Sequence, residues 1–261
     1  MLKNYFKIAW RNITRHKAFS FINIFGLAIG LASCIIIMLY ILNESSYDKD
    51  QKDRDRIFRI ASQSSKEQAP WVAVAAPIGF AAKDNLPEVE EVTRLMTFPE
   101  IAKMLVSYKN DAAQKQFFET NGYYVDSTYF QIFTYQFIYG NGKTALNEPN
   151  SIVISSAMSQ KYFGNTDPVG KSLLINTPFG EFNYTVKAVF NNSKYKSHIP
   201  ANCLLSMRNN DMWNWIQGQT TFIGNGIFFT YVKLKQGSDV KLFEKKLQSF
   251  FGAAEWPGAA G

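Results

Sequence analysis

The residues best suited to chemistry lie in a glycine-rich segment, residues 164–172, with the sequence GNTDPVGKS. It resembles a phosphate-binding P-loop, in which four residues separate a glycine from Gly-Lys-Ser/Thr and backbone N–H groups surround the phosphates. Here five residues intervene, and they include Asp167, whose carboxylate would repel phosphate, and Pro168, which has no N–H to donate. A helix is expected before this segment and a strand after it, the reverse of the P-loop order. We therefore do not expect nucleotide binding.

Other arrangements of catalytic residues are missing from the sequence. The two histidines, His16 and His198, cannot form a metal site by themselves, and no Cys/His cluster has the spacing of a zinc site. A Ser-His-Asp triad would need His198, but no nucleophile elbow accompanies it. Cys34 lies in an apolar run and Cys203 far from it, so no disulfide is expected, and Cys203 is predicted to be a small buried apolar residue. The sequence predicts no enzyme, no cofactor and no metal site.

The element on which the rest of the chain depends is an uncharged segment from Ala18 to Asn43. As a helix, its 26 residues would be roughly 39 Å long, against a hydrocarbon core of about 30 Å, so residues 18–43 are predicted to span a bilayer. Residues 1–17 contain five basic and no acidic side chains, which favours a cytoplasmic N-terminus. Everything after Glu44 is then expected outside the cytoplasm.

Two kinds of N-terminal processing are alternatives to this anchor. A secretory signal peptide has an apolar region of about 7–15 residues, whereas residues 35–42 extend the apolar run well past that length. Residues 31–34 (LASC) resemble a lipoprotein cleavage site, which would make Cys34 a lipidated N-terminus. In a lipoprotein the apolar region ends at that cysteine, but here the more hydrophobic half follows it. The uncleaved helix is the favoured interpretation.

Residues 1–17 are predicted to form a cytoplasmic amphipathic helix. Apolar residues recur at helical spacing with basic residues on the other side, which is typical of a helix lying along the inner leaflet. The alternative is a simple cytoplasmic extension of the membrane helix. Outside this segment the chain has 23 of its 28 basic residues and 21 acidic ones, so the rest of it is nearly neutral. The excess positive charge therefore indicates anionic lipid as the partner, and not nucleic acid. The interfacial residues are Lys3, Lys7, Trp10, Arg11, Arg15 and Lys17.

Small residues mark one face of the apolar segment. Gly26 and Gly30 are four residues apart, and Ala28 and Ala32 have the same spacing. Small residues at i and i+4 let a second helix backbone approach closely. We expect this face to pack against another membrane helix.

The remaining residues predict an α+β domain of short, alternating strands with a few helices. A charged linker, residues 44–56, leads into a domain of residues 57–251, and a tail without periodicity, residues 252–261, is predicted to be disordered. A strand–helix pair near each end of the domain, with strands between, indicates an α/β part interrupted by a β-rich insertion. The predicted strands are 57–60, 90–96, 102–108, 116–120, 151–155, 172–176, 182–190 and 226–235, and the predicted helices are 77–85, a short one capped by residues 126–128, 157–163 and 239–250.

Several stretches carry a family resemblance. Residues 4–12 (NYFKIAWRN) and 21–32 (FINIFGLAIGLA) look like the opening of MacB/FtsX-type ABC transporter permeases. Residues 125–133 (VDSTYFQIF) resemble the "VD..FF..F" stretch of the MacB-like periplasmic core domain. Residues 152–171, from IVIS to DPVGK, are similar to that domain's "vvis…A.k.fG..dPvGk" signature. Order and spacing agree over roughly residues 1–250.

The resemblance implies a permease subunit of the bacterial inner membrane with a periplasmic main domain. Such a subunit works as a homodimer with a separate cytoplasmic ABC ATPase, and passes ATP-driven movement to the periplasmic domain for efflux, export or signalling. A periplasmic adaptor or outer-membrane protein is a further partner of such systems. The family's porter part would correspond to about residues 57–100 and 226–251, and its inserted sabre part to about residues 101–225. The signature turn would comprise Asp167, Pro168, Gly170 and Lys171.

The chain departs from the family in its membrane helices. Permeases of this family carry three more after the periplasmic domain, and these 261 residues contain none of them. We therefore expect an N-terminal fragment of a permease or a truncated product. The alternative function is a standalone membrane-anchored binding or adaptor module without transport activity.

Overall fold

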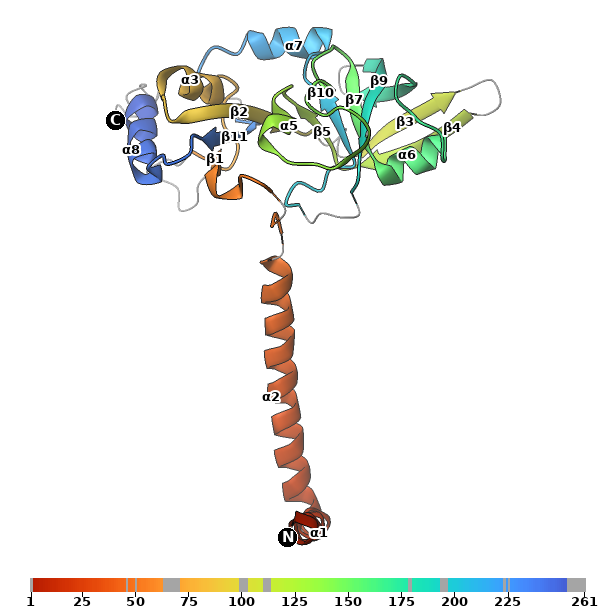
Figure 1. The fold of residues 1–261 in the computed structure, drawn as a ribbon, viewed down its shortest axis with the longest axis vertical. Coiled ribbons are helices and arrows are strands. Elements are labelled where there is room, and N and C mark those ends of the chain that lie inside the picture. Colours follow the sequence, from red (N-terminus) through yellow and green to blue (C-terminus); the bar gives the residue numbers. More distant parts are fainter. Residues whose placement is uncertain are drawn as a thin grey trace. The chain divides into compact units, whose positions relative to one another are not determined.

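The computed structural model describes residues 2–45, 47–49, 51–62, 71–98, 103–109, 114–177, 180–192, 197–222, 224 and 226–252. These residues belong to two compact units, Met1–Lys49 and Asp50–Gly261, which are described separately. Figure 1 shows the helices and strands of both units.

The first unit consists of two helices, α1 (Leu2–Arg15) and α2 (Lys17–Glu44). They are separated at His16, whose φ of −113° and ψ of 60° lie outside the helical region. As a result, α1 turns away from the axis of α2 (Figure 1). Residues 2–44 are therefore two helices and not one continuous helix.

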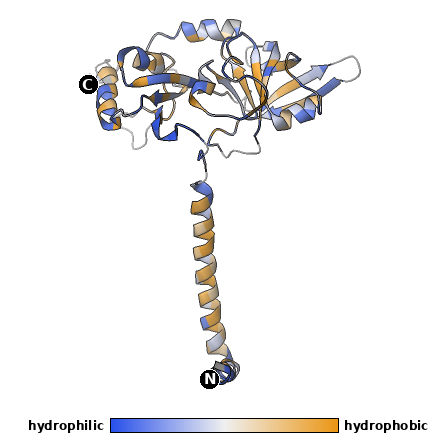
Figure 2. Cartoon of the chain, viewed as in Figure 1, coloured by the Kyte–Doolittle hydropathy of each residue, from blue (hydrophilic) through white to orange (hydrophobic). Residues whose placement is uncertain are grey.

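Helix α2 is the one helix among the described residues that is long and apolar enough to cross a membrane, judged by length and composition. Its large apolar side chains are exposed along its length in this unit, and Figure 2 shows the apolar colour along most of the helix. A helix that is apolar on all sides needs apolar surroundings, which a bilayer supplies. The observed helix includes the predicted span, residues 18–43, with one further residue at each end.

The second unit is built on one mixed sheet of eleven strands in the order β1-β11-β2-β5-β10-β7-β9-β8-β3-β4, with β6 paired to β9. The β5–β10 and β7–β9 pairs are parallel, and the other pairs are antiparallel. The strands are β1 (Ile57–Ile60), β2 (Val89–Met96), β3 (Lys103–Lys109), β4 (Gln114–Thr120), β5 (Gly122–Val125), β6 (Phe137–Gly140), β7 (Ser151–Ser155), β8 (Ser172–Thr177), β9 (Gly180–Phe190), β10 (Cys203–Ser206) and β11 (Phe229–Leu234).

Helices cover this sheet and close three buried apolar clusters. One cluster surrounds Tyr124 and Tyr184 in the middle of the sheet, a second surrounds Tyr129 and Phe190, and a third lies under α3 and α8 around Val92. The helices of the unit are η1 (Arg54–Arg56), α3 (Ile78–Asn85), α5 (Tyr129–Ile132), α6 (Ser156–Phe163), α7 (Asn210–Gln217) and α8 (Val240–Gly252).

Strands from the two ends of the second unit meet at one side of the sheet, where β11 lies between β1 and β2. The strands of the middle segment continue the same sheet from β5, where Leu95 of β2 pairs with Val125. The mixed α+β fold predicted from the sequence is therefore present, and it is organised around a continuous sheet.

Every predicted strand and helix has a counterpart, with ends that differ by a few residues. Five of the described elements have no counterpart among the predictions: η1, β5, β6, β10 and α7. Residues 253–261 of the predicted tail lie outside the described residues.

Candidate functional site

A buried ion pair between Arg94 and Asp126 joins two neighbouring strands of the second unit. Arg94 lies on β2, and Asp126 directly follows β5. The Arg94 Nε and Nη2 atoms donate to the two carboxylate oxygens of Asp126 at 2.9 Å each. The backbone N–H of Arg94 also donates to Asp126 Oδ2, at 2.8 Å. The two side chains are only 4% and 6% exposed. A bidentate, enclosed pair of this kind fixes the position of β2 against β5.

Arg94 also holds helix α3 against the sheet. Its Nη1 donates to the carbonyl oxygen of Ala76, just before α3, at 3.0 Å. Its guanidinium carbon lies 4.5 Å from the ring centre of Phe80 and 5.4 Å from that of Phe228, within cation–π range. The charge of Arg94 is therefore balanced within the domain, and the residue serves as a junction between β2, β5 and α3.

The predicted capping of a short helix by residues 126–128 is wrong. Helix α5 begins after Thr128, but the Thr128 side chain makes no capping bond and instead donates to the carbonyl oxygen of Val92 at 2.6 Å. The Asp126 carboxylate goes to Arg94, because a charge-assisted bidentate pair is stronger than a bond to a neutral backbone N–H. The aspartate of the "VD" stretch is therefore a structural residue.

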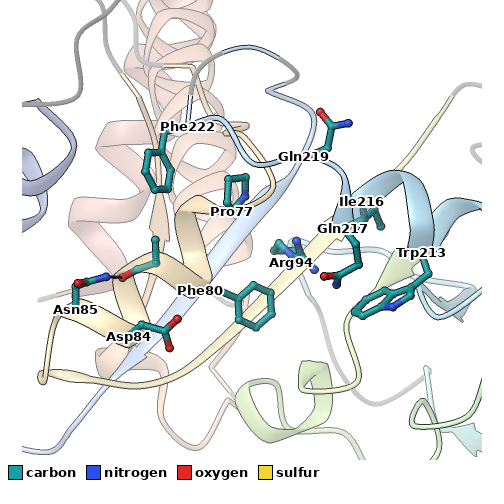
Figure 3. A pocket seen from close by; sticks show the side chains of 11 residues that line it. Pro77, Phe80, Asp84, Asn85, Arg94, Trp213, Ile216, Gln217, Gln219 and Phe222 are labelled. Atoms are coloured by element: carbon teal, nitrogen blue, oxygen red, sulfur yellow. Dashed lines mark hydrogen bonds between the residues drawn. The ribbon is translucent and has the colours of Figure 1, made fainter.

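A cleft of about 480 Å³ lies between helices α3 and α7 (Figure 3). Figure 3 shows Arg94 between Phe80 and Gln217 in the lining. The lining residues are Pro77, Phe80, Ala81, Asp84, Asn85, Arg94, Trp213, Ile216, Gln217, Gln219 and Phe222.

Aromatic and amide side chains make up much of the cleft's lining. Phe80, Trp213 and Phe222 supply aromatic surface, and amide side chains supply hydrogen-bonding groups. Since Arg94 is paired, Asp84 is the one lining residue whose charge has no ion-pair partner among the described residues. The lining contains no Ser, Cys or His that could act as a nucleophile or base, and within the described part of the chain no three His, Cys, Asp or Glu side chains could together hold a metal ion.

The glycine-rich segment after α6 is a turn that satisfies its own backbone groups. Gly170 has a φ of +84°, and its N–H donates to the carbonyl oxygen of Val186 at 2.8 Å. The Lys171 N–H donates to the carbonyl oxygen of Pro168 at 3.0 Å, and the Asp167 carboxylate accepts from a backbone N–H two residues further on. The backbone N–H groups of Val169, Gly170 and Lys171 are therefore already bonded inside the protein.

A second group of charges, which we call the anchor cluster, consists of Asp53, Arg56, Glu90 and Lys233. Arg56 contacts Asp53 and Glu90 at 2.6 Å each, and Lys233 contacts Glu90 at 2.6 Å and Asp53 at 3.6 Å. The hydrogen bond from Arg56 lowers the pKa of Asp53, and that from Lys233 lowers the pKa of Glu90. Two residues of the expected charged linker are thus in contact with β2 and β11.

Histidine and cysteine side chains of the second unit have packing roles. His198 Nε2 lies 2.9 Å from the Tyr231 hydroxyl, and its ring packs against Phe133. Cys203 is fully buried on β10, as predicted, and burial raises the pKa of its thiol far above its usual value. These surroundings favour packing over catalysis for both residues.

The residues predicted to act in the membrane all lie in the first unit. An added Cβ at Gly26 or Gly30 would meet no atom within 4 Å, so the small face of α2, with Ala28 and Ala32, is open. The predicted interfacial residues are all exposed in this unit; they are Lys3, Lys7, Trp10, Arg11 and Arg15 on α1 and Lys17 at the start of α2. Their packing and lipid-binding roles remain predictions.

These features define a class of protein: a mixed-sheet domain attached to one helix that could cross a membrane, with an open cleft and buried structural charges. The chain belongs to the MacB-like periplasmic core domain family, whose model matches residues 20–250. It is thus a MacB-like periplasmic domain of ABC-transporter-type permeases. Among curated proteins, none matches the chain significantly.

The first two of the following solved structures share this fold at low sequence identity. A permease domain from Porphyromonas gingivalis is 21% identical, with a TM-score of 0.60, and the match covers 78% of this chain and 87% of that one. The periplasmic region of MacB from Actinobacillus actinomycetemcomitans is 13% identical, with a TM-score of 0.51, covering 76% and 83%. The extracellular domain of the transporter YknZ from Gram-positive bacteria is 14% identical, with a TM-score of 0.47, covering 75% and 95%.

Proposed function

We propose that this chain is the N-terminal part of a MacB/FtsX-like permease subunit that transmits conformational change from a separate cytoplasmic ATPase to the periplasmic domain. One observation carries the proposal: the family match begins inside α2 and ends inside α8, so the apolar helix and the sheet domain form one module. A membrane helix that leads directly into a folded domain can convert helix movement into domain movement. The ATP would be hydrolysed by another subunit.

The same proposal assigns roles to the first unit. The chain would lie in the bacterial inner membrane with α1 on the cytoplasmic side, because basic residues near a span resist translocation. The exposed basic side chains and Trp10 of α1 would hold it on anionic lipid. The open small-residue face around Gly26 and Gly30 would pack against a helix of a second protomer or of the same permease.

The proposal is tested by measuring ATP-driven movement in the assembled permease. Lys143 is an exposed residue of the second unit, and a spin label at Lys143→Cys, with Cys34→Ala, would report the distance between two protomers in nanodiscs. With the ATPase subunit present and unable to hydrolyse ATP, we expect ATP to shift that distance distribution. An unchanged distribution, in a sample where the ATPase is shown to have bound ATP, would contradict transmission.

A second candidate function is a membrane-anchored binding or adaptor module, and the cleft between α3 and α7 favours it. The aromatic lining offers the apolar surface on which binding sites usually depend. In that case the chain alone would bind a periplasmic partner stably without an ATPase, and Trp213→Ala would weaken the binding. Retention of the partner only when the ATPase is present would favour the transport role.

A further inference from the structure

The chain is fastened to the sheet immediately after it leaves the first unit. Gln51, the second residue of the second unit, is 8% exposed. Its Oε1 accepts from the backbone N–H of Thr134 at 2.7 Å, and its Nε2 donates to the carbonyl oxygen of Thr134 at 3.3 Å. This amide pairing ties the start of the unit to the segment that follows α5.

The anchor cluster is the next attachment along the chain. Arg56 bridges Asp53 to Glu90 of β2, and its Nη1 also donates to the carbonyl oxygen of Leu234 at 2.8 Å. Lys233 of β11, whose side chain is 10% exposed, bonds to Glu90 from the other side. Two cations and two anions alternate, so each charge contacts an opposite one and the cluster is neutral.

The position of the cluster in the chain has a mechanical consequence. Strand β1 follows at once, has four residues, lies at the edge of the sheet and pairs with β11. An edge strand of this length could be peeled away one hydrogen bond at a time. A pull from the N-terminal side meets Gln51 and the anchor cluster before it meets β1, and the cluster spreads that pull onto β11 and β2.

We propose that the anchor cluster, with Gln51, is the point at which movement of α2 enters the periplasmic sheet. The inference rests on the proposed transmission function. Movement delivered to β2 would act on a strand that pairs with neighbours on both sides. This strand carries Arg94, which bonds to the segment before α3 and lines the cleft. Without the cluster, the same movement would detach residues 51–60 from the sheet and would not reach β2.

Force measurement on the whole chain in a nanodisc tests this proposal. Pulling handles are placed at Ser45→Cys, after α2, and at Lys143→Cys, in a turn outside the cluster, in a Cys34→Ala background. In this parent chain we expect no lengthening before the domain unfolds. Glu90→Gln removes the carboxylate shared by Arg56 and Lys233, and should produce an early step of about 30 Å, the length of roughly ten freed residues.

The matched control is Glu148→Gln, which breaks the exposed Lys187–Glu148 pair elsewhere in the domain. It should behave like the parent chain. An early step in the parent chain, or a Glu90→Gln trace that matches Glu148→Gln, would overturn the proposal. A lower unfolding force for Glu90→Gln without an early step would also overturn it, because the cluster would then only add stability.

The force experiment and the ATP experiment can each reject one proposal without rejecting the other. No ATPase is present during pulling, so an early step in the parent chain rejects the anchor without touching the transmission function. Conversely, an absence of ATP-driven movement rejects transmission while an intact mechanical attachment is still observed.

Discussion

At the scale of single residues, Arg94 and Asp126 bear most directly on stability. Replacing Arg94 with Met would leave the buried Asp126 carboxylate without its cationic partner, with the backbone N–H of residue 94 as a remaining donor. Breaking a buried ion pair in this way costs about 3–5 kcal/mol. For a domain of this size that corresponds to a melting temperature lower by roughly 6–20 °C. Thermal unfolding of the full chain in detergent, followed by near-ultraviolet circular dichroism, measures the shift.

Two further variants isolate the cause of that loss. Lys187→Met breaks an exposed pair, which is worth at most about 1 kcal/mol, and should change the melting temperature little. The double variant Arg94→Met, Asp126→Leu removes both charges and should recover much of the loss, since apolar replacement of a buried pair is often nearly neutral. Equal melting temperatures for Arg94→Met and Lys187→Met would contradict the role given to the pair.

The anchor cluster predicts how stability depends on pH. Bonds from Arg56 and Lys233 lower the pKa values of Asp53 and Glu90 below their ordinary values of 3.8 and 4.5. A carboxyl group whose pKa is lowered by folding contributes stability above its unfolded-state pKa and loses it as the pH falls toward the folded-state pKa. The domain should therefore become less stable below about pH 4.5.

Melting curves between pH 3 and pH 7 measure that effect. Glu90→Gln cannot ionise at this position, so its melting temperature should fall less steeply on the acid side than that of the unmodified chain. Parallel acid limbs for the two proteins would show that the cluster is not the source of the acid sensitivity.

Single-residue chemistry was only partly predictable from the sequence. The burial of Cys203 was predicted, because its neighbours are apolar. The partner of Asp126 was not, because Arg94 lies 32 residues earlier in the chain and a cap was the nearest use for an aspartate before a short helix. The anchor cluster was missed for the same reason: Glu90 and Lys233 come from strands at opposite ends of the domain.

At the scale of elements, the open small-residue face of α2 predicts association. Gly30→Leu has room in the isolated helix and favours helix formation by up to about 1 kcal/mol, but its side chain would prevent close approach of another backbone. We expect self-association in bilayers, measured by energy transfer between labelled chains, to fall by roughly tenfold, or about 1.4 kcal/mol. Gly30→Ala keeps a small residue and should retain most of the association. If Gly30→Leu associated as strongly as the unmodified chain, the small-residue face would be excluded as the contact surface.

The predictability of elements depended on the burial pattern. β8 alternates between exposed and buried residues and was predicted with its two-residue period. β10 is buried at all four positions, and its sequence CLLS has neither alternation nor β-branched residues, so it was missed. β7 is equally buried, but its Ile-Val-Ile run allowed it to be predicted. The strand predicted from Gly226 begins only at Phe229 in the structure, because the residues before it form a bridge between Val74 and Phe228 instead of a ladder.

At the scale of the whole molecule, the topology needed information that local patterns do not contain. The α+β class and the order of most elements were predicted from periodicity. The sequence did not reveal that β5 joins the outer strands to the middle segment, because this contact depends on a parallel pairing with β10 across about eighty residues. Parallel pairings between distant segments leave no short-range signal in a single sequence.

The uneven charge of the two ends of α2 predicts one orientation of the whole chain. The N-terminal side carries five basic and no acidic residues, and moving them across the membrane would be unfavourable. In intact spheroplasts, a membrane-impermeant maleimide should label Lys143→Cys in the second unit and leave Asn12→Cys of α1 unlabelled until the membrane is permeabilised, both in a Cys34→Ala background. Labelling of Asn12→Cys in intact spheroplasts would place α1 outside, where no cytoplasmic ATPase could act on it. That result would contradict the transmission function. Replacing the five basic residues with Gln should weaken the preference and give a mixed population, which ties the orientation to these charges.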